Sequence, residues 1–142
     1  MAYIGAVATW DDVACLALAL PRTSERVSRG LRQWRVADKL FVWERPLRRK
    51  EIEALSGRVP EGPILAARVE HLLAKEALLA DDRRLYFTTP HFDGYPAVLM
   101  HIPDLARLDR EELEDAVVEA WSTRAQKRVA RAWLDQHGVS DD

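Results

Sequence analysis

The segment QWRVADKLFVW, from Gln33 to Trp43, determines how this chain folds. Trp34 and Val36 alternate with charged residues, which is the period of a strand with one buried face. The run 39–43 is short and rich in aromatic and branched residues, as strands are. Because only positions 37–38 separate the two runs, we expect a tight antiparallel hairpin.

The residues before this hairpin predict a helix and a further strand, the strand near 26–29. The i, i+3, i+4, i+7 spacing of one buried helix face is shared by Val13, Leu16, Ala17 and Leu20. Cys15 lies inside this apolar helix, so we expect it in the core as a small hydrophobic residue.

The middle of the chain alternates between helical and extended patterns. Residues 47–56 are typical of a short basic helix with Ile52 on its inner side. The run 64–70 alternates between apolar and polar positions, so we expect a strand that is exposed on one face. The other elements expected here are a helix over 72–80 and two antiparallel strands, over 85–89 and 97–102.

The last third is expected to form two helices. The apolar stripe of the first consists of Leu113, Ala116, Val117, Ala120 and Trp121. The second, over 124–137, is expected to bury Val129, Ala130, Trp133 and Leu134. Core packing is also the role expected of the five tryptophans, which are Trp10, Trp34, Trp43, Trp121 and Trp133.

The order of these elements predicts an α+β fold in two layers. One antiparallel sheet of about five or six strands is expected to pack against helices. A chain of 142 residues can bury one sufficient core, so we expect a single domain over 1–138 and a short acidic tail over 139–142.

Composition excludes several classes of protein. With 21 Lys plus Arg, 23 Asp plus Glu and a formal charge of −2, the chain is neither a uniformly basic coat protein nor an acidic tail protein. The single cysteine excludes an internal disulfide and a multi-cysteine zinc framework, and it fits a reducing cytoplasm. The longest apolar run, 13–20, is shorter than the roughly 20 residues of a membrane helix. We therefore expect a cytoplasmic protein without a membrane partner.

Basic residues are concentrated between positions 22 and 58, where the net charge is +6. Clustered Lys and Arg neutralise phosphates, so this segment predicts a nucleic-acid-binding surface. The alternative is a solvated surface whose charges are interleaved with glutamates from elsewhere. The residues expected to contact phosphates are Arg29, Arg32, Arg35, Lys39, Arg48, Arg49 and Lys50.

A second basic stripe is expected on the last helix. Its members share one helix face through their i, i+3, i+4, i+7 spacing, and they are Arg124, Lys127, Arg128 and Arg131. Such a stripe could follow a phosphate backbone. It could equally pair with the acidic face of the preceding helix or remain solvated.

The segment FTTPHFDGYPAVLM, from Phe87 to Met100, is the most unusual string in the chain. His91, Asp93 and Tyr95 lie between its two strands and form a candidate ligand loop. A structural loop is the alternative, because its prolines and glycine favour a turn. The chain contains no glycine-rich phosphate loop, dinucleotide fingerprint or HExxH motif. We therefore expect no enzyme, no catalytic residues, no cofactor and no metal site.

Five strings in this chain resemble the MmcQ/YjbR family. They are QWRVADKLFVW, GPILAARV (62–69), KEALL (75–79), FTTPHFDGYPAVLM and AQKRVARAWL (125–134). The resemblance implies a compact α+β fold like that of type III secretion chaperones, and DNA binding through a "double wing" of paired strands without catalytic residues. By this resemblance, the hairpin 34–43 corresponds to one wing and the strand pair 85–102 to the other. Asp38 departs from the family's glycine at the tip and would repel phosphate.

Three functions follow as expectations. The first is non-catalytic binding of double-stranded DNA through phosphates, without sequence specificity. The second is a homodimeric or protein-binding adaptor, for which Ile64, Phe92 and Tyr95 would supply apolar surface. The third is a small-ligand binder or enzyme at the loop that contains His91.

Overall fold

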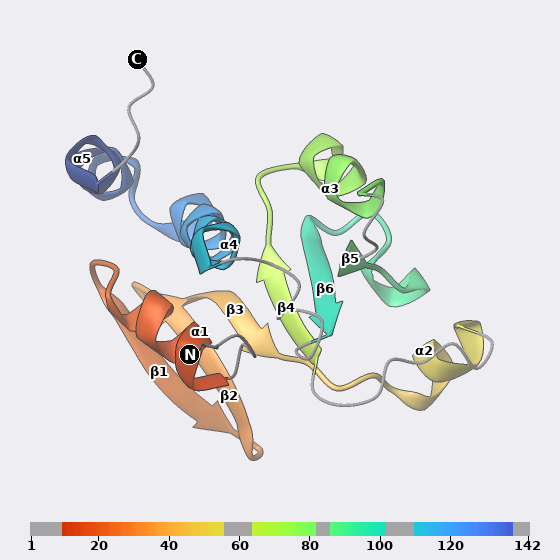
Figure 1. The fold of residues 1–142 in the computed structure, drawn as a ribbon. Helices are drawn as coiled ribbons and strands as arrows, with labels where there is room; N and C mark the ends of the chain where they lie inside the picture. The colour runs from red at the N-terminus through yellow and green to blue at the C-terminus, as the bar shows by residue number, and fades with distance from the viewer. Residues whose placement is uncertain (1–9, 56–63, 82–85, 102–109, 138–142) are drawn as a thin grey trace, which may run out of the picture.

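The computed structural model describes residues 10–55, 64–81, 86–101 and 110–137 as a six-stranded sheet with helices packed on it (Figure 1). The strands are β1 (Thr23–Ser28), β2 (Leu31–Val36), β3 (Lys39–Glu44), β4 (Ile64–Arg68), β5 (Tyr86–Phe87) and β6 (Ala97–His101). The helical elements are α1 (Trp10–Leu18), α2 (Arg49–Ala54), α3 (Leu72–Leu79), the 3-10 turn η2 (Pro90–Phe92), α4 (Arg110–Arg124) and α5 (Lys127–His137).

The sheet order is β1-β2-β3-β4-β6-β5, and all neighbouring strands are antiparallel. This arrangement confirms the predicted α+β class and the antiparallel pairing of β5 with β6. The expected tail at 139–142 lies outside the described residues. Within the described ranges, no helix combines the length and apolar character that crossing a bilayer requires.

The β2–β3 hairpin forms as predicted, and its turn is two residues long. Ala37 and Asp38 have φ of 49° and 68°, and the β1–β2 turn repeats this pattern at Arg29 and Gly30 with 54° and 79°. Positive φ at both central residues is typical of the type I′ turn, whose twist matches that of paired strands. Ala37 carries a Cβ in a conformation that favours glycine, so strand packing must hold this turn in place.

β3 contains one extra residue opposite β2. Trp34 pairs with Val42 and Arg35 with Leu40, which leaves Phe41 as a bulge. Both Phe41 and Val42 are buried in the main core. The side chains of β2 alternate regularly between the two faces of the sheet, because its pairing with β1 is continuous along its whole length.

Two apolar clusters lie on opposite faces of the sheet. The main core contains residues of α1, α4 and the sheet, including the fully buried Trp34 and Trp121, and residues of α3 pack against it. A smaller cluster around Trp43 lies on the other face, on the side of η2. The predicted packing role of the tryptophans is confirmed, since Trp10 and Trp133 also pack against the main core.

Four residues of the predicted α4 stripe, Leu113, Val117, Ala120 and Trp121, are buried in the main core, whereas Ala116 is half-buried. Two other expectations about helices are wrong. Cys15 is exposed, because α1 buries its neighbours Ala14 and Leu16 and the cysteine lies on the uncovered side. Leu134 is 40% exposed, because Ala130 is the residue that α5 buries.

Two expectations about the middle of the chain are also wrong. Ile52 is 40% exposed, because α2 turns Glu51 inward instead. β4 is not half-exposed: Leu65 and Ala67 lie in the main core, while Ile64 enters the smaller cluster on the opposite face. β4 is buried on both faces because it occupies the centre of the sheet, between β3 and β6.

Candidate functional site

One face of β1 and β2 carries polar side chains that are exposed or half-exposed in the described structure. The alternation of the strands assigns to this face five polar residues and the apolar Leu31; the polar ones are Ser24, Arg26, Ser28, Gln33 and Arg35. The pairs across the ladder are Ser24 with Arg35 and Arg26 with Gln33. We call this surface the open face, since the apolar residues of β2, Trp34 and Val36, point to the other side.

Arg35 is held in a fixed position on the open face. Its Nε and Nη2 atoms donate to Gln33 Oε1 at 3.3 and 3.0 Å, and Nη1 donates to the Asp38 carbonyl oxygen at 2.9 Å. These bonds use three of the five N–H donors of a guanidinium, so two remain for an anion. The Asp38 carboxylate also lies 3.5 Å from Arg26 at the exposed end of the hairpin.

Arg32 lies on the opposite face of the same strand. Its Nε donates to Glu25 Oε2 at 2.8 Å, Nη1 lies 3.5 Å from Asp11 of α1, and its guanidinium stacks 5.2 Å from the Trp34 ring centre. Glu25 also accepts from the Trp34 indole at 3.1 Å. The hydrogen bond from Arg32 holds the pKa of Glu25 below its ordinary value, and Glu25 in turn raises the pKa of Arg32.

The seven basic residues predicted to bind phosphates therefore do not form a single patch. Arg32 is separated from Arg35 by the thickness of the sheet. Arg29 and Lys39 lie at opposite ends of β2, a strand of six residues and roughly 20 Å. Three others, Arg48, Arg49 and Lys50, are exposed together at the start of α2.

The start of α2 borders a concave surface. Arg48, Arg49 and Lys50 line a cavity of about 640 Å³, together with Glu51, Pro90 and His91. A second cavity, of about 340 Å³, lies on the other side of His91 and is lined by Trp43, Arg45, His91, Phe92 and Tyr95. His91 thus connects the basic residues of α2 with an aromatic pocket.

A buried ion pair fixes α2 against the loop that contains His91. Glu51 accepts from both terminal nitrogens of Arg45, at 2.9 and 3.1 Å, from the Arg48 backbone N–H at 2.8 Å and from the Thr89 hydroxyl at 2.7 Å. Burial raises the pKa of Glu51, but these hydrogen bonds outweigh it and hold the pKa below its ordinary value. The Arg45 guanidinium also stacks 5.0 Å from the Phe92 ring centre.

Lys75 holds the same loop from α3. Its ammonium group is buried and donates to the carbonyl oxygens of Phe92 and Tyr95 at 2.6 and 2.9 Å. Burial lowers the pKa of Lys75, and the nearby Asp93 carboxylate opposes that effect. Sequence reasoning missed both Lys75 and the Glu51 network, although the spacing of Arg48 and Glu51 matches a capping box.

The loop positions its candidate residues at the surface. His91, Asp93 and Tyr95 are all exposed, while Phe92 between them is buried. The Tyr95 hydroxyl accepts from Arg68, whose guanidinium lies 4.9 Å from the centre of the tyrosine ring. In the part of the chain that the structure describes, no group of three His, Cys, Asp or Glu residues could hold a metal ion.

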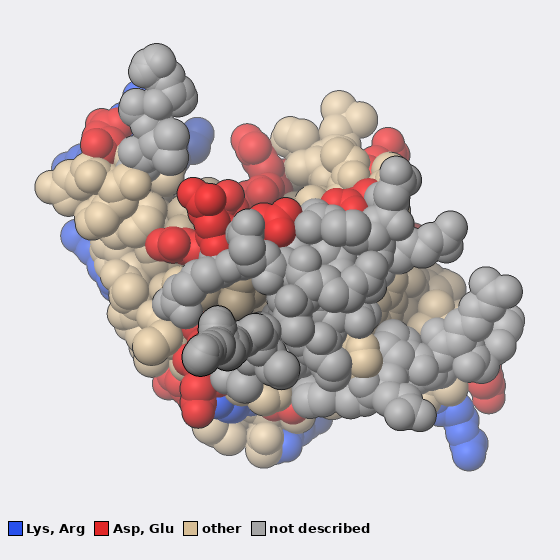
Figure 2. Space-filling model, in the orientation of Figure 1, with Lys and Arg blue, Asp and Glu red and all other residues tan. Residues whose placement is uncertain are grey.

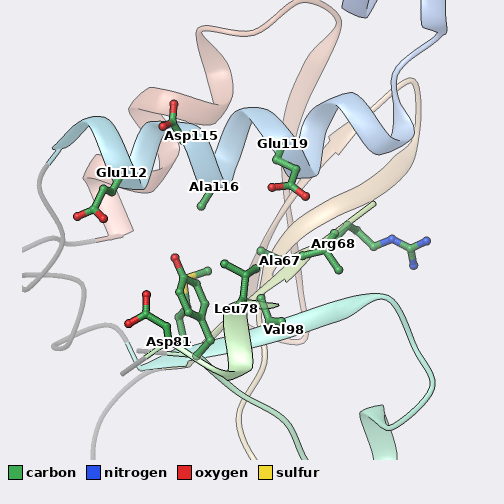
Figure 3. Close-up of a pocket in the computed structure, with 12 residues that line it drawn as sticks. Ala67, Arg68, Leu78, Asp81, Val98, Glu112, Asp115, Ala116 and Glu119 are labelled. Atoms are coloured by element: carbon green, nitrogen blue, oxygen red, sulfur yellow. The ribbon is translucent and has the colours of Figure 1, made fainter. Parts of the chain in front are cut away.

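A pocket on the helix side of the sheet is acidic. A pocket of about 220 Å³ lies between α3 and α4, where Glu112 and Glu119 extend from α4 and Asp81 approaches from the other side (Figure 3). Arg68 points away from this pocket (Figure 3). Acidic side chains gather at the surface in this region (Figure 2). These carboxylates disfavour the binding of a phosphate in this pocket.

The second basic stripe is divided between two helices. Arg124 is the last residue of α4, whereas Lys127, Arg128 and Arg131 belong to α5. The chain leaves the helical conformation between them, so the expectation of one continuous helix face is wrong for Arg124. The three residues of α5 are exposed.

The apolar surface expected for an adaptor is largely absent from the described loop and strand. Ile64 and Phe92 are buried in the smaller cluster, and only Tyr95 of the three expected residues is exposed, at 41%. The residues near η2 therefore pack the sheet rather than offer a dimer interface.

The fold and the site together define a two-layer α+β domain with basic residues on its open sheet face and at α2. No protein-family model matches the chain, and no solved structure matches it. The chain is 45% identical over 135 residues to the uncharacterized protein Rv2570 of Mycobacterium tuberculosis, a match that covers 93% of this chain and 100% of that protein. The uncharacterized protein Mb2600 of Mycobacterium bovis matches with the same identity and coverage. The chain belongs to the family of these mycobacterial proteins.

Proposed function

We propose that this protein binds nucleic acid through its phosphates, without reading base sequence, and that it does so in the cytoplasm. The observation that carries the proposal is the separation of charge across the sheet. Cations are exposed on the open face and at α2, whereas carboxylates line the pocket between α3 and α4. The resemblance of five strings to the MmcQ/YjbR family, whose members are described as DNA-binding, also supports it.

The cations of the proposed surface form two groups, one on the open face and one at the start of α2. They are Arg26, Arg35, Arg48, Arg49 and Lys50. Arg26, which is largely exposed and 3.5 Å from the exposed Asp38, is an addition to the residues predicted from sequence. Three predicted residues are left out: Arg32 because Glu25 and Asp11 neutralise it, Lys39 because it pairs with Val36 on the face of the main core, and Arg29 because it lies in the β1–β2 turn. Contacts between side-chain cations and phosphate oxygens carry no sequence information, so we expect similar affinity for unrelated duplexes.

The test is fluorescence anisotropy of a labelled random-sequence duplex at about 50 and 200 mM salt. With about five phosphate contacts, the log-log salt slope is about −4 to −5, and affinity falls about 250- to 1,000-fold over this range. The double variant Arg49→Gln, Lys50→Gln should make that slope shallower by about 2. The matched control Lys127→Gln, Arg128→Gln removes the same charge from α5 and should leave the slope unchanged.

Two results would overturn the proposal. Absence of binding at the lower salt concentration would show that the basic residues are ordinary solvated surface. A larger effect of the α5 variant than of the α2 variant would place the phosphate contacts on the wrong side of the domain.

The edge strand β1 favours pairing of two copies as a second candidate function. Among the described strands, β1 has a neighbour on one side only, and Val27 near its end is 62% exposed. An unpaired strand edge can join the same edge of another copy. Light scattering coupled to size-exclusion chromatography tests this candidate: a dimer that Val27→Lys dissociates is expected, and a monomer at high concentration contradicts it.

A further inference from the structure

Two cavities that share His91 differ in the chemistry of their walls. One is lined by aromatic residues and Arg45, and the other by the cations of α2. We propose that together they hold one unpaired nucleotide of a nucleic-acid strand, with its base in the aromatic cavity and its phosphate beside α2. This inference rests on the proposed function and adds a single-stranded substrate to it.

The aromatic cavity has the size and the surfaces that a base requires. Its volume of about 340 Å³ falls within the range of small-molecule pockets. Tyr95 and His91 are exposed and offer ring surfaces on which a base can stack, as bases do in proteins that bind single strands. Phe92 and Trp43 are nearly buried and form the apolar wall behind them.

The neighbouring cavity suits a phosphate. Arg48, Arg49 and Lys50 are exposed along its rim. Glu51 is the acidic residue among its described lining, and its two oxygens are already occupied by Arg45, Thr89 and a backbone N–H. The net charge that a phosphate meets there is therefore positive, and charge-assisted hydrogen bonds to Arg are available.

The loop that carries the stacking residues is held before any ligand arrives. Lys75 bonds two of its carbonyl oxygens, and Glu51 bonds the Thr89 hydroxyl at its start. Arg68 stacks on the ring of Tyr95 and donates to its hydroxyl. A ligand that enters the cavity therefore loses little affinity to the ordering of this loop.

The nucleotide must be unpaired, because a base inside a duplex is stacked on both faces and paired at its edge. Side chains reach the face of a base in loops, ends and single strands. Duplex binding and single-strand binding therefore share the cations of α2, whereas only single-strand binding uses the aromatic cavity.

The experiment compares three labelled ligands by fluorescence anisotropy at low salt. They are a single strand of about 12 nucleotides, an abasic strand of the same length and charge, and the corresponding duplex. We expect the intact strand to bind at least about fivefold more tightly than the abasic strand, the weakest effect expected for one stacked base. The double variant His91→Ala, Tyr95→Ala should lower the affinity for the intact strand to that for the abasic strand, while the affinity for the duplex stays the same.

The control variant is His137→Ala, which removes another exposed histidine whose ring stacks on an aromatic residue, Trp133, at 4.4 Å. It should leave the affinities for all three ligands unchanged. Thermal unfolding followed by circular dichroism verifies that each variant is folded.

Each contrary result has its own meaning. Equal affinity for intact and abasic strands, with duplex binding preserved, overturns the nucleotide site and leaves the proposed function standing. Absence of binding to all three ligands overturns both. If thymidine monophosphate binds as tightly as the strand, the site belongs to free nucleotides and the assignment to a strand is overturned.

Discussion

Glu51→Gln is the substitution that tests the buried ion pair most sharply. The amide keeps nearly the shape of the carboxylate but loses its charge, which leaves the buried guanidinium of Arg45 uncompensated. Removing one partner of a buried pair costs about 3 to 5 kcal/mol of unfolding free energy. In a domain of this size, each kcal/mol lowers Tm by about 3 °C, so we expect a decrease of about 9 to 15 °C.

The assay is thermal unfolding followed by circular dichroism, supported by urea titration. Glu53→Gln is the matched control, since it makes the same chemical change on the exposed side of the same helix. Its effect should stay within about 0.5 kcal/mol, as for ordinary surface substitutions. If both variants unfold at the same temperature, the assignment of Glu51 as the residue that anchors α2 is refuted.

Three further predictions concern stability and mobility. Glu25 and Glu51 have pKa values below the ordinary 4.5. Their contribution to the free energy of unfolding is therefore complete above that pH and is lost as pH falls through their folded-state pKa values. Urea unfolding between pH 6 and 3 measures this loss, and an unfolding free energy that does not change with pH would contradict it. Lys75→Met leaves two carbonyl oxygens without their donor, and hydrogen exchange over 89–96 should accelerate about tenfold, in contrast to unchanged exchange in β2. Ala37→Gly relieves a positive φ of 49° and should raise stability by up to about 1 kcal/mol in urea titration, whereas a loss would show that the turn is unstrained.

The sequence was sufficient to predict the elements whose signal is local. The hairpin around Ala37 and the core stripe of α4 depend on periodicity, and both are confirmed, except that Ala116 of the stripe is only half-buried. The exposure of Cys15 could also have been predicted, because it lies off the helix face that its apolar neighbours define. The spacing of Arg32 and Arg35 could likewise have predicted that they lie on opposite faces, since residues three apart on a strand point to opposite sides of the sheet.

The polar network around the loop could not be predicted in the same way. Glu51 and Thr89 are 38 positions apart in the chain, and Lys75 lies on a third element. Only tertiary packing brings these residues together, and each one taken alone is typical of exposed surface. The burial of β4 on both faces could not be predicted for the same reason, because the position of a strand in the sheet order does not follow from its own residues.

The central claim is that nucleic acid contacts the open face and avoids the helix side, and Arg35 and Arg32 test it on one strand. Each is replaced by Gln, and the salt dependence of duplex affinity is measured by fluorescence anisotropy. We predict that Arg35→Gln makes the log-log slope shallower by about 0.9, the value of one phosphate contact, while Arg32→Gln leaves it unchanged. Equal slopes for both variants, or a change for Arg32→Gln alone, would contradict the account.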